Sequence, residues 1–184
     1  MSLDRPKKTK MLVVDDEPDN LDLLYRTFRR DFNVLRAESG VAALEVLANE
    51  GEVAVIISDQ RMPEMKGTEF LSKTVPQFPD TMRIILTGFT DVEDLVEAIN
   101  SGQVYKYITK PWDPNELKQV VQRAAETYEL LKQRTDELHQ AQAQIALLNA
   151  ITEAGQQSGS LDDGAAAIVS AFKQTFAVTD CKLW

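Results

Sequence analysis

Six polar residues of this sequence stand where short apolar runs end, and their types suit the binding of a cation and a phosphoryl group. They are Asp15, Asp16, Glu17, Asp59, Thr87 and Lys110. Carboxylate oxygens suit Mg²⁺, which keeps several waters and is commonly shared between one or two carboxylates and a phosphate. Neighbouring carboxylates repel one another, which raises their proton affinity unless a cation intervenes. A lysine and a threonine hydroxyl supply the positive charge and the donor that a transferred phosphoryl oxygen needs.

The elements that must position these residues follow an alternating pattern up to about residue 111. Short apolar runs alternate with amphipathic segments, which is typical of a parallel sheet with helices between its strands. The expected strands are 11–14, 33–35, 53–57, 83–86 and 104–108. Helices are expected around 21–28, after the N-cap Ser39, at 90–101 and from Asp113 onwards. We therefore expect an α/β fold, a doubly wound five-stranded parallel sheet, with all six polar residues at the carboxyl edge where ligands bind.

The helix that begins at Asp113 does not end where a compact domain would end it. Neither glycine nor proline occurs from Asn115 to Ala154. A heptad seam, with residues alternately four and three apart, runs through this stretch. Its members are Leu117, Val121, Ala124, Tyr128, Leu131, Thr135, Leu138, Gln142, Ile145 and Asn149. The seam predicts a parallel homodimer through residues 117–149. The alternative is an amphipathic helix that folds back on its own domain.

The composition excludes several classes of protein. The chain has 184 residues, 43% of them hydrophobic and 27% charged, and no apolar stretch approaches the roughly 20 residues that span a bilayer. Its start lacks the apolar run of a secretory signal, so we expect a cytoplasmic protein. A net charge of −9 argues against direct nucleic-acid binding. The single cysteine, Cys181, excludes an internal disulfide and a zinc site built on several thiolates.

Four motifs, taken together and in order, resemble a known family. They are VVDDEP at 13–18, SDQRMPEMKGTEFL at 58–71, ILTGF at 85–89 and YITKPW at 107–112. This combination resembles the receiver domain of bacterial two-component response regulators. The resemblance covers residues 9 to about 125 and implies a flavodoxin-like sheet of strand order 2-1-3-4-5, followed by the extended C-terminal helix.

The resemblance implies a role for each acidic residue. Asp59 would accept a phosphoryl group from the phosphohistidine of a sensor histidine kinase. The chain would therefore be a phosphoacceptor switch that catalyses only its own phosphorylation and dephosphorylation. Mg²⁺ would be the cofactor, bound directly by Asp16, Asp59 and the backbone carbonyl of Arg61, and through water by Asp15.

Further residues would hold or sense the phosphoryl group. Thr87 and Lys110 would hold its oxygens, and the peptide bond after Lys110 would be cis. Tyr107 matches an aromatic position whose ring turns inward when Thr87 moves toward the phosphate. Arg61 and Phe89 would flank the phosphoryl site, where attacking water approaches, and we expect them to change the lifetime of the phosphate.

The expected organisation places a receiver domain ahead of a signalling helix. It comprises a disordered lead-in at 1–8, the receiver at 9–125, a coiled-coil linker at 126–154 and the truncated start of a further domain at 155–184. The last segment, with LLNAIT before it at 147–152 and a final Cys-Lys-Leu-Trp, resembles the opening of a GAF domain. The full protein would thus relay phosphorylation through a dimeric helix to an output module that this chain lacks.

Two other functions are weighed against this one. A coiled-coil scaffold that is never phosphorylated would have no use for Asp59, Thr87 and Lys110 at one edge. A Mg²⁺-dependent phosphatase of the haloacid-dehalogenase type also uses an aspartyl phosphate, but its nucleophile stands in a D-x-D arrangement after the first strand. Here the first strand is followed by Asp15-Asp16-Glu17. The sequence therefore favours the receiver.

Overall fold

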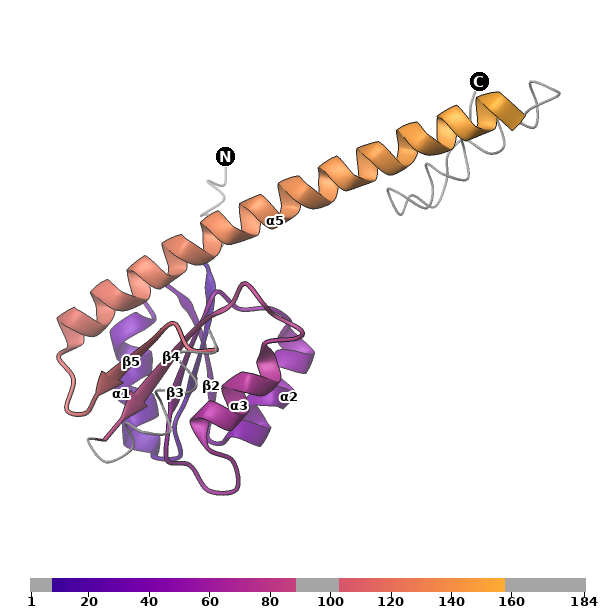
Figure 1. Ribbon diagram of the computed structural model, residues 1–184. Helices are drawn as coiled ribbons and strands as arrows, with labels where there is room; N and C mark the ends of the chain where they lie inside the picture. The colour runs from indigo at the N-terminus through magenta and orange to yellow at the C-terminus, as the bar shows by residue number, and fades with distance from the viewer. Residues whose placement is uncertain (1–7, 89–102, 158–184) are drawn as a thin grey trace, which may run out of the picture. The chain divides into compact units, whose positions relative to one another are not determined.

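The computed structural model describes residues 8–88 and 103–157 (Figure 1). The chain divides after Leu131 into two units. The strands are β1 Lys10–Val14, β2 Asn33–Ala37, β3 Val55–Asp59, β4 Met82–Thr87 and β5 Lys106–Thr109. The helices of the described residues are α1 Pro18–Phe28, α2 Gly40–Glu50, α3 Gly67–Thr74 and α5 Pro114–Gln157. The helix expected at 90–101 and the GAF-like segment from 158 onwards lie outside the described residues.

The five strands form one parallel sheet in the order β2-β1-β3-β4-β5. This order and the α/β class confirm the sequence-based expectation. β3 begins two residues later than predicted, because ladder pairing with β1 and β4 starts at Val55, although Val53 and Ala54 are also buried. Burial and strand pairing therefore do not begin at the same residue.

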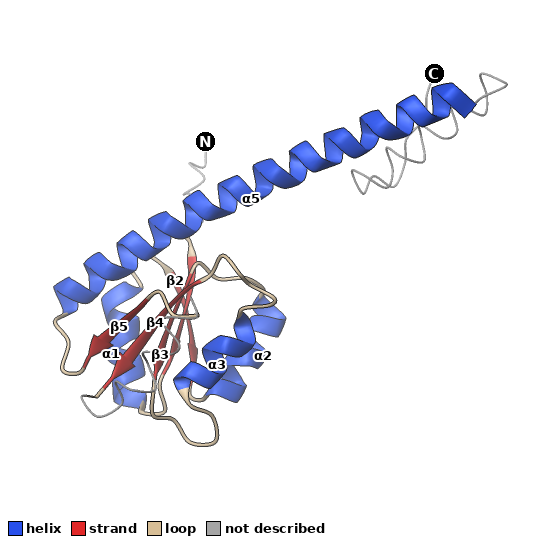
Figure 2. Cartoon of the chain, in the orientation of Figure 1, coloured by secondary structure: helices blue, strands red, loops and turns tan. Residues whose placement is uncertain are grey.

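The sheet separates two apolar cores, one on each face. Figure 2 shows α2 and α3 on one side of the sheet and α1 on the other. Phe70 and Leu71 of α3 pack with Leu47 of α2 in one core. Leu24 and Phe28 of α1 pack in the other. Strands buried on both faces are typical of parallel sheets and hold the strand ends in fixed positions.

Two helix starts follow the capping chemistry that the sequence indicates. The Ser39 hydroxyl accepts a hydrogen bond from the Ala42 amide at the start of α2. The Asp113 carboxylate accepts from the amides of Asn115 and Glu116 at the start of α5. Side-chain acceptors at this position satisfy amides that have no partner within the helix.

The predicted seam of α5 has two different environments. Leu117, Val121 and Ala124 are at most 1% exposed and belong to the same core as α1. Leu138 and Ile145 are 63% and 58% exposed. The expected pairing surface of 117–149 is thus wrong for its first three members, because these residues pack inside their own domain. Pairing through the later positions stays a prediction.

None of the helices in the described ranges is long and apolar enough to cross a membrane.

Candidate functional site

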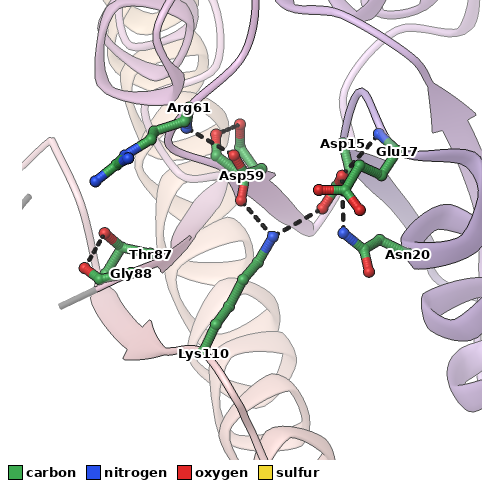
Figure 3. A network of polar contacts seen from close by, with 9 residues as sticks. Asp15, Glu17, Asn20, Asp59, Arg61, Thr87, Gly88 and Lys110 are labelled. Atoms are coloured by element: carbon green, nitrogen blue, oxygen red, sulfur yellow. Dashed lines mark hydrogen bonds and ion pairs between the residues drawn. The ribbon is translucent and has the colours of Figure 1, made fainter. Parts of the chain in front are cut away.

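The carboxyl ends of β1, β3 and β5 bring three of the singled-out side chains into direct contact (Figure 3). Lys110 Nζ lies 3.2 Å from Asp15 Oδ2 and 2.5 Å from Asp59 Oδ1. Both carboxylates are buried, whereas the lysine side chain is 30% exposed. Lys110 comes one residue after β5, and its peptide bond to Pro111 is cis, as the resemblance implied. An ion pair at a buried strand end follows directly from the sheet order.

The remaining carboxylate oxygens are held by hydrogen bonds from the loops that follow the strands. The Arg61 amide donates to Asp59 Oδ2 at 2.6 Å. Asp15 Oδ1 accepts from the Glu17 amide at 3.0 Å and from the Asn20 side-chain amide at 3.2 Å. Each carboxylate thus has one oxygen fixed by its own loop and the other turned toward Lys110. This arrangement orients both groups without a further ligand.

Burial raises the pKa of Asp59, and the negative charge of Asp15 acts in the same direction. The hydrogen bond and charge of Lys110 oppose this shift in the pKa of Asp59 without cancelling it. Burial alone would lower the pKa of Lys110, but the hydrogen bonds and charges of Asp59 and Asp15 outweigh it, so the Lys110 pKa is raised. Lys110 is therefore a firmly charged ammonium.

The oxygen donors at this edge suit a hard divalent cation. Two carboxylates facing one ammonium leave a net negative charge, which a cation such as Mg²⁺ would neutralise. Asp16 adds an exposed carboxylate next to Asp15. Within residues 8–88 and 103–157, no group of three Asp, Glu, His or Cys side chains is drawn together tightly enough to hold a metal. The donor chemistry and charge therefore fit Mg²⁺, and Lys110 lies between the two nearest carboxylates.

Thr87 is placed at the same edge of the sheet but is directed elsewhere. It is the last residue of β4, is 1% exposed, and donates its hydroxyl hydrogen bond to the Gly88 carbonyl at 3.0 Å. Its own carbonyl accepts from the Lys110 amide at 2.7 Å. Tyr107 on β5 is 41% exposed. Phe89 lies outside the described residues.

Comparison with known proteins decides the family. The family described as the response regulator receiver domain matches residues 11–122, well over half of the chain. The chain belongs to the response regulator receiver family. The receiver domain is 41% identical over 120 residues to the hydrogenase transcriptional regulatory protein HoxA of Cupriavidus necator, which covers 65% of this chain and 25% of HoxA. The chain therefore spans about a quarter of that relative.

Two further relatives consist almost entirely of the matched region. A chemotaxis protein CheY homolog of Campylobacter jejuni is 35% identical over 114 residues, or 60% of this chain and 87% of that protein. The crystal structure of adenylate cyclase from Rhodopirellula baltica superposes with a TM-score of 0.69 at 33% identity, over 71% of this chain and 97% of that one. The matched regions thus agree with the receiver seen in the fold.

The receiver site also contains residues that sequence reasoning did not identify. Asn20 orients Asp15 from the first turn of α1. Gln60, directly after Asp59, is buried and bonds to Thr68. The signal for Asn20 was a short amide side chain in the helix turn that follows an acidic strand end. The signal for Gln60 was a polar residue where the preceding strand residues are apolar.

Proposed function

We propose that this receiver domain is a switch that accepts a phosphoryl group on Asp59 from the phosphohistidine of a sensor histidine kinase. The contact of the buried Asp59 carboxylate with Lys110 carries the proposal. It places a nucleophile and a fixed positive charge together at the carboxyl end of β3, in a chain of the receiver family. A charged lysine that touches the acceptor can neutralise charge on the transferred group.

The geometry supports a division of labour between the two oxygens of Asp59. Oδ2 is held by the Arg61 amide, and Oδ1 faces Lys110. In the proposed step Oδ1 attacks the phosphorus and a P–O bond forms. The P–N bond to the donor imidazole breaks, and the imidazole nitrogen keeps the electron pair and takes up a proton. Lys110 then binds a phosphoryl oxygen, while the Arg61 amide keeps the carboxyl group in place.

Mg²⁺ would be held by Asp15, Asp16, Asp59 and the backbone carbonyl of Arg61. When bound, it would neutralise the carboxylates and the incoming phosphoryl oxygens together. The net negative charge of Asp15 and Asp59 facing Lys110 supports this assignment.

Thr87 and Tyr107 are the proposed switch residues. A phosphoryl group on Asp59 would offer the Thr87 hydroxyl a charged acceptor, which makes a stronger hydrogen bond than the Gly88 carbonyl that it now contacts. Movement of Thr87 toward the phosphate would leave space into which the exposed ring of Tyr107 turns. The switch would thus change the β5 surface.

The proposed output route runs along α5. Leu138 and Ile145 are seven residues apart and exposed, which is the spacing of one position of a heptad. A parallel homodimer through the part of the seam beyond Leu131 would bring two linkers together. Such a pairing would pass the state of the receiver to an output module, for which the GAF-like segment stays a prediction.

Acetyl phosphate tests the phosphoacceptor function without knowledge of the kinase. We expect the wild type to incorporate phosphate in the presence of Mg²⁺ and to lose this ability in EDTA. Asp59→Asn is expected to incorporate none, because an amide oxygen is a poor nucleophile. Equal labelling in Mg²⁺ and EDTA, or undiminished labelling of Asp59→Asn, would refute the proposal.

A further inference from the structure

Gln60 carries a polar amide, yet it is only 1% exposed. An unpaired buried amide costs free energy, so its partners define its role. Gln60 Oε1 accepts a hydrogen bond from the Thr68 backbone amide at 3.0 Å, and Gln60 Nε2 donates to Thr68 Oγ1 at 3.3 Å. We call this two-point contact the Gln60–Thr68 clasp. It joins the residue after the phosphoacceptor to the first turn of α3.

The clasp supplies the cap that α3 otherwise lacks. The N-cap residue, Lys66, makes no side-chain cap hydrogen bond. The first amides of a helix need acceptors from outside the helix. The Gly67 amide donates to the backbone carbonyl of Gln60 at 3.0 Å, and the Thr68 amide donates to its side chain. Gln60 therefore accepts the hydrogen bonds of the first two amides of α3.

The same contacts close the loop that carries Arg61. The Gln60 amide donates to the Leu86 carbonyl at 3.0 Å, which ties the start of the loop to β4. The end of the loop returns to Gln60 through Gly67 and Thr68. Because both ends meet at one residue, the backbone between them has little freedom. Within this closed loop, the Arg61 amide bonds to Asp59 Oδ2.

We propose that Gln60 is a positioning residue for the phosphoacceptor. The Gln60–Thr68 clasp holds the backbone of Arg61 so that its amide orients the Asp59 carboxylate. It thereby also sets the affinity for Mg²⁺, through the Arg61 carbonyl. This inference rests on the proposed function of Asp59, and it assigns a task to a residue that makes no contact with the transferred group.

Substitutions at both partners separate positioning from simple loss of stability. Gln60→Met keeps the length of the side chain and removes both contacts. Thr68→Val removes only the hydroxyl, and Thr68→Ser keeps it as the conservative rescue. Arg83→Met is the matched control, because the buried Arg83 side chain donates to Thr74 Oγ1 and to the Phe78 and Thr81 carbonyls around the far end of α3.

We expect Gln60→Met to lower the rate of acetyl-phosphate labelling about tenfold at a fixed low Mg²⁺ concentration, as loss of hydrogen-bonded orientation predicts. The Mg²⁺ concentration for half-maximal labelling should rise, and excess Mg²⁺ should recover part of the rate. Thr68→Val should show a smaller effect, and Thr68→Ser should match the wild type. Arg83→Met should lower the unfolding temperature yet keep the wild-type Mg²⁺ requirement.

Hydrogen exchange tests the clasp independently of phosphorylation. In Gln60→Met the amide of Arg61 should exchange faster, while amides of β1 should be unchanged. An unchanged Arg61 amide would overturn the proposal, and so would an Arg83→Met variant with as great a rise in Mg²⁺ requirement as Gln60→Met. If the wild type takes no label at all, the proposed function of Asp59 fails. The exchange of Arg61 still decides whether the clasp positions this loop.

Discussion

Replacement of Gly67 by alanine is expected to displace the backbone of the phosphoacceptor. Gly67 is the first residue of α3, and a Cβ atom built there would lie 2.1 Å from the backbone carbonyl oxygen of Asp59. Real Cβ atoms essentially never approach closer than 3.0 Å, so the contact must open by about 0.9 Å, the difference between the two distances. The atom in the way is backbone, which cannot rotate aside.

The size of the effect follows from what must move. Overpacking of a filled site typically costs about 1–3 kcal/mol, and a rigid neighbour places Gly67→Ala at the upper end of that range. The displaced carbonyl of Asp59 also accepts a hydrogen bond from Ser58 Oγ at 2.8 Å, which the shift would disturb. A misplacement of about 1 Å at a reacting group can cost roughly 100-fold in rate. We expect acetyl-phosphate labelling to fall by about 10- to 100-fold.

Gly40→Ala is the matched control. Gly40 is also the first residue of its helix, α2, so the change in helix propensity is the same. A Cβ atom at Gly40 would meet Met65 Sδ at 2.9 Å and Met65 Cγ at 3.2 Å. These atoms belong to a flexible side chain that can move aside. We expect a stability change within about 1 kcal/mol and labelling at the wild-type rate.

Urea unfolding and the rate of acetyl-phosphate labelling measure the two consequences. If Gly67→Ala were as stable as Gly40→Ala and were labelled equally fast, the close approach of α3 to the Asp59 carbonyl would not matter. The reasoning from the added Cβ atom would then be refuted.

Three further predictions concern charge, switching and pairing. In EDTA near neutral pH, Asp59→Asn should unfold at a higher temperature than the wild type, because burial raises the pKa of Asp59 and so penalises its charged form. This advantage should shrink as the pH falls through the folded-state pKa toward the model value of 3.8, where the wild type regains stability by taking up a proton. Beryllofluoride with Mg²⁺ should change hydrogen exchange within residues 87–110, as the coupling of Thr87 to Tyr107 requires. Leu138→Asp combined with Ile145→Asp should convert a dimeric chain to monomers in sedimentation at tens of micromolar, with Asp59 labelling retained.

Each of these predictions has a result that contradicts it. An Asp59→Asn advantage that grows as the pH falls would reverse the sign of the pKa argument. Unaltered exchange across 87–110 would show that the switch coupling is absent. For pairing, Gln140→Asp with Gln144→Asp is the control, since it adds the same charges at exposed positions off the seam. A monomeric wild type, or equal dissociation by both pairs, would exclude the seam as the dimer interface.

The fold was largely predictable because local signals and burial agree in a parallel sheet. Apolar runs marked all five strands, and the caps at Ser39 and Asp113 are found where their side chains indicated. The shift of β3 arises because Val53 is buried without taking part in the strand ladder. α3, eight residues long, is too short to show a helical period.

The site was predictable in its members but not in its fine contacts. Sheet topology alone brings Asp15, Asp59 and Lys110 together, so their types and strand positions were sufficient. The Gln60–Thr68 clasp joins residues eight positions apart with no repeating spacing, and only the folded loop brings them together. Likewise, heptad spacing cannot distinguish a residue such as Val121, which packs in its own domain, from one that faces a second chain.

Chemical trapping of the acyl phosphate tests the central claim most directly. After incubation with acetyl phosphate and Mg²⁺, borohydride reduction converts a phosphorylated aspartate to homoserine, which peptide mass spectrometry can locate. The proposed function predicts homoserine at position 59 and no conversion of Asp15 or Asp16. Homoserine at either of those two residues, or no conversion at position 59 in a sample that carries label, would contradict it.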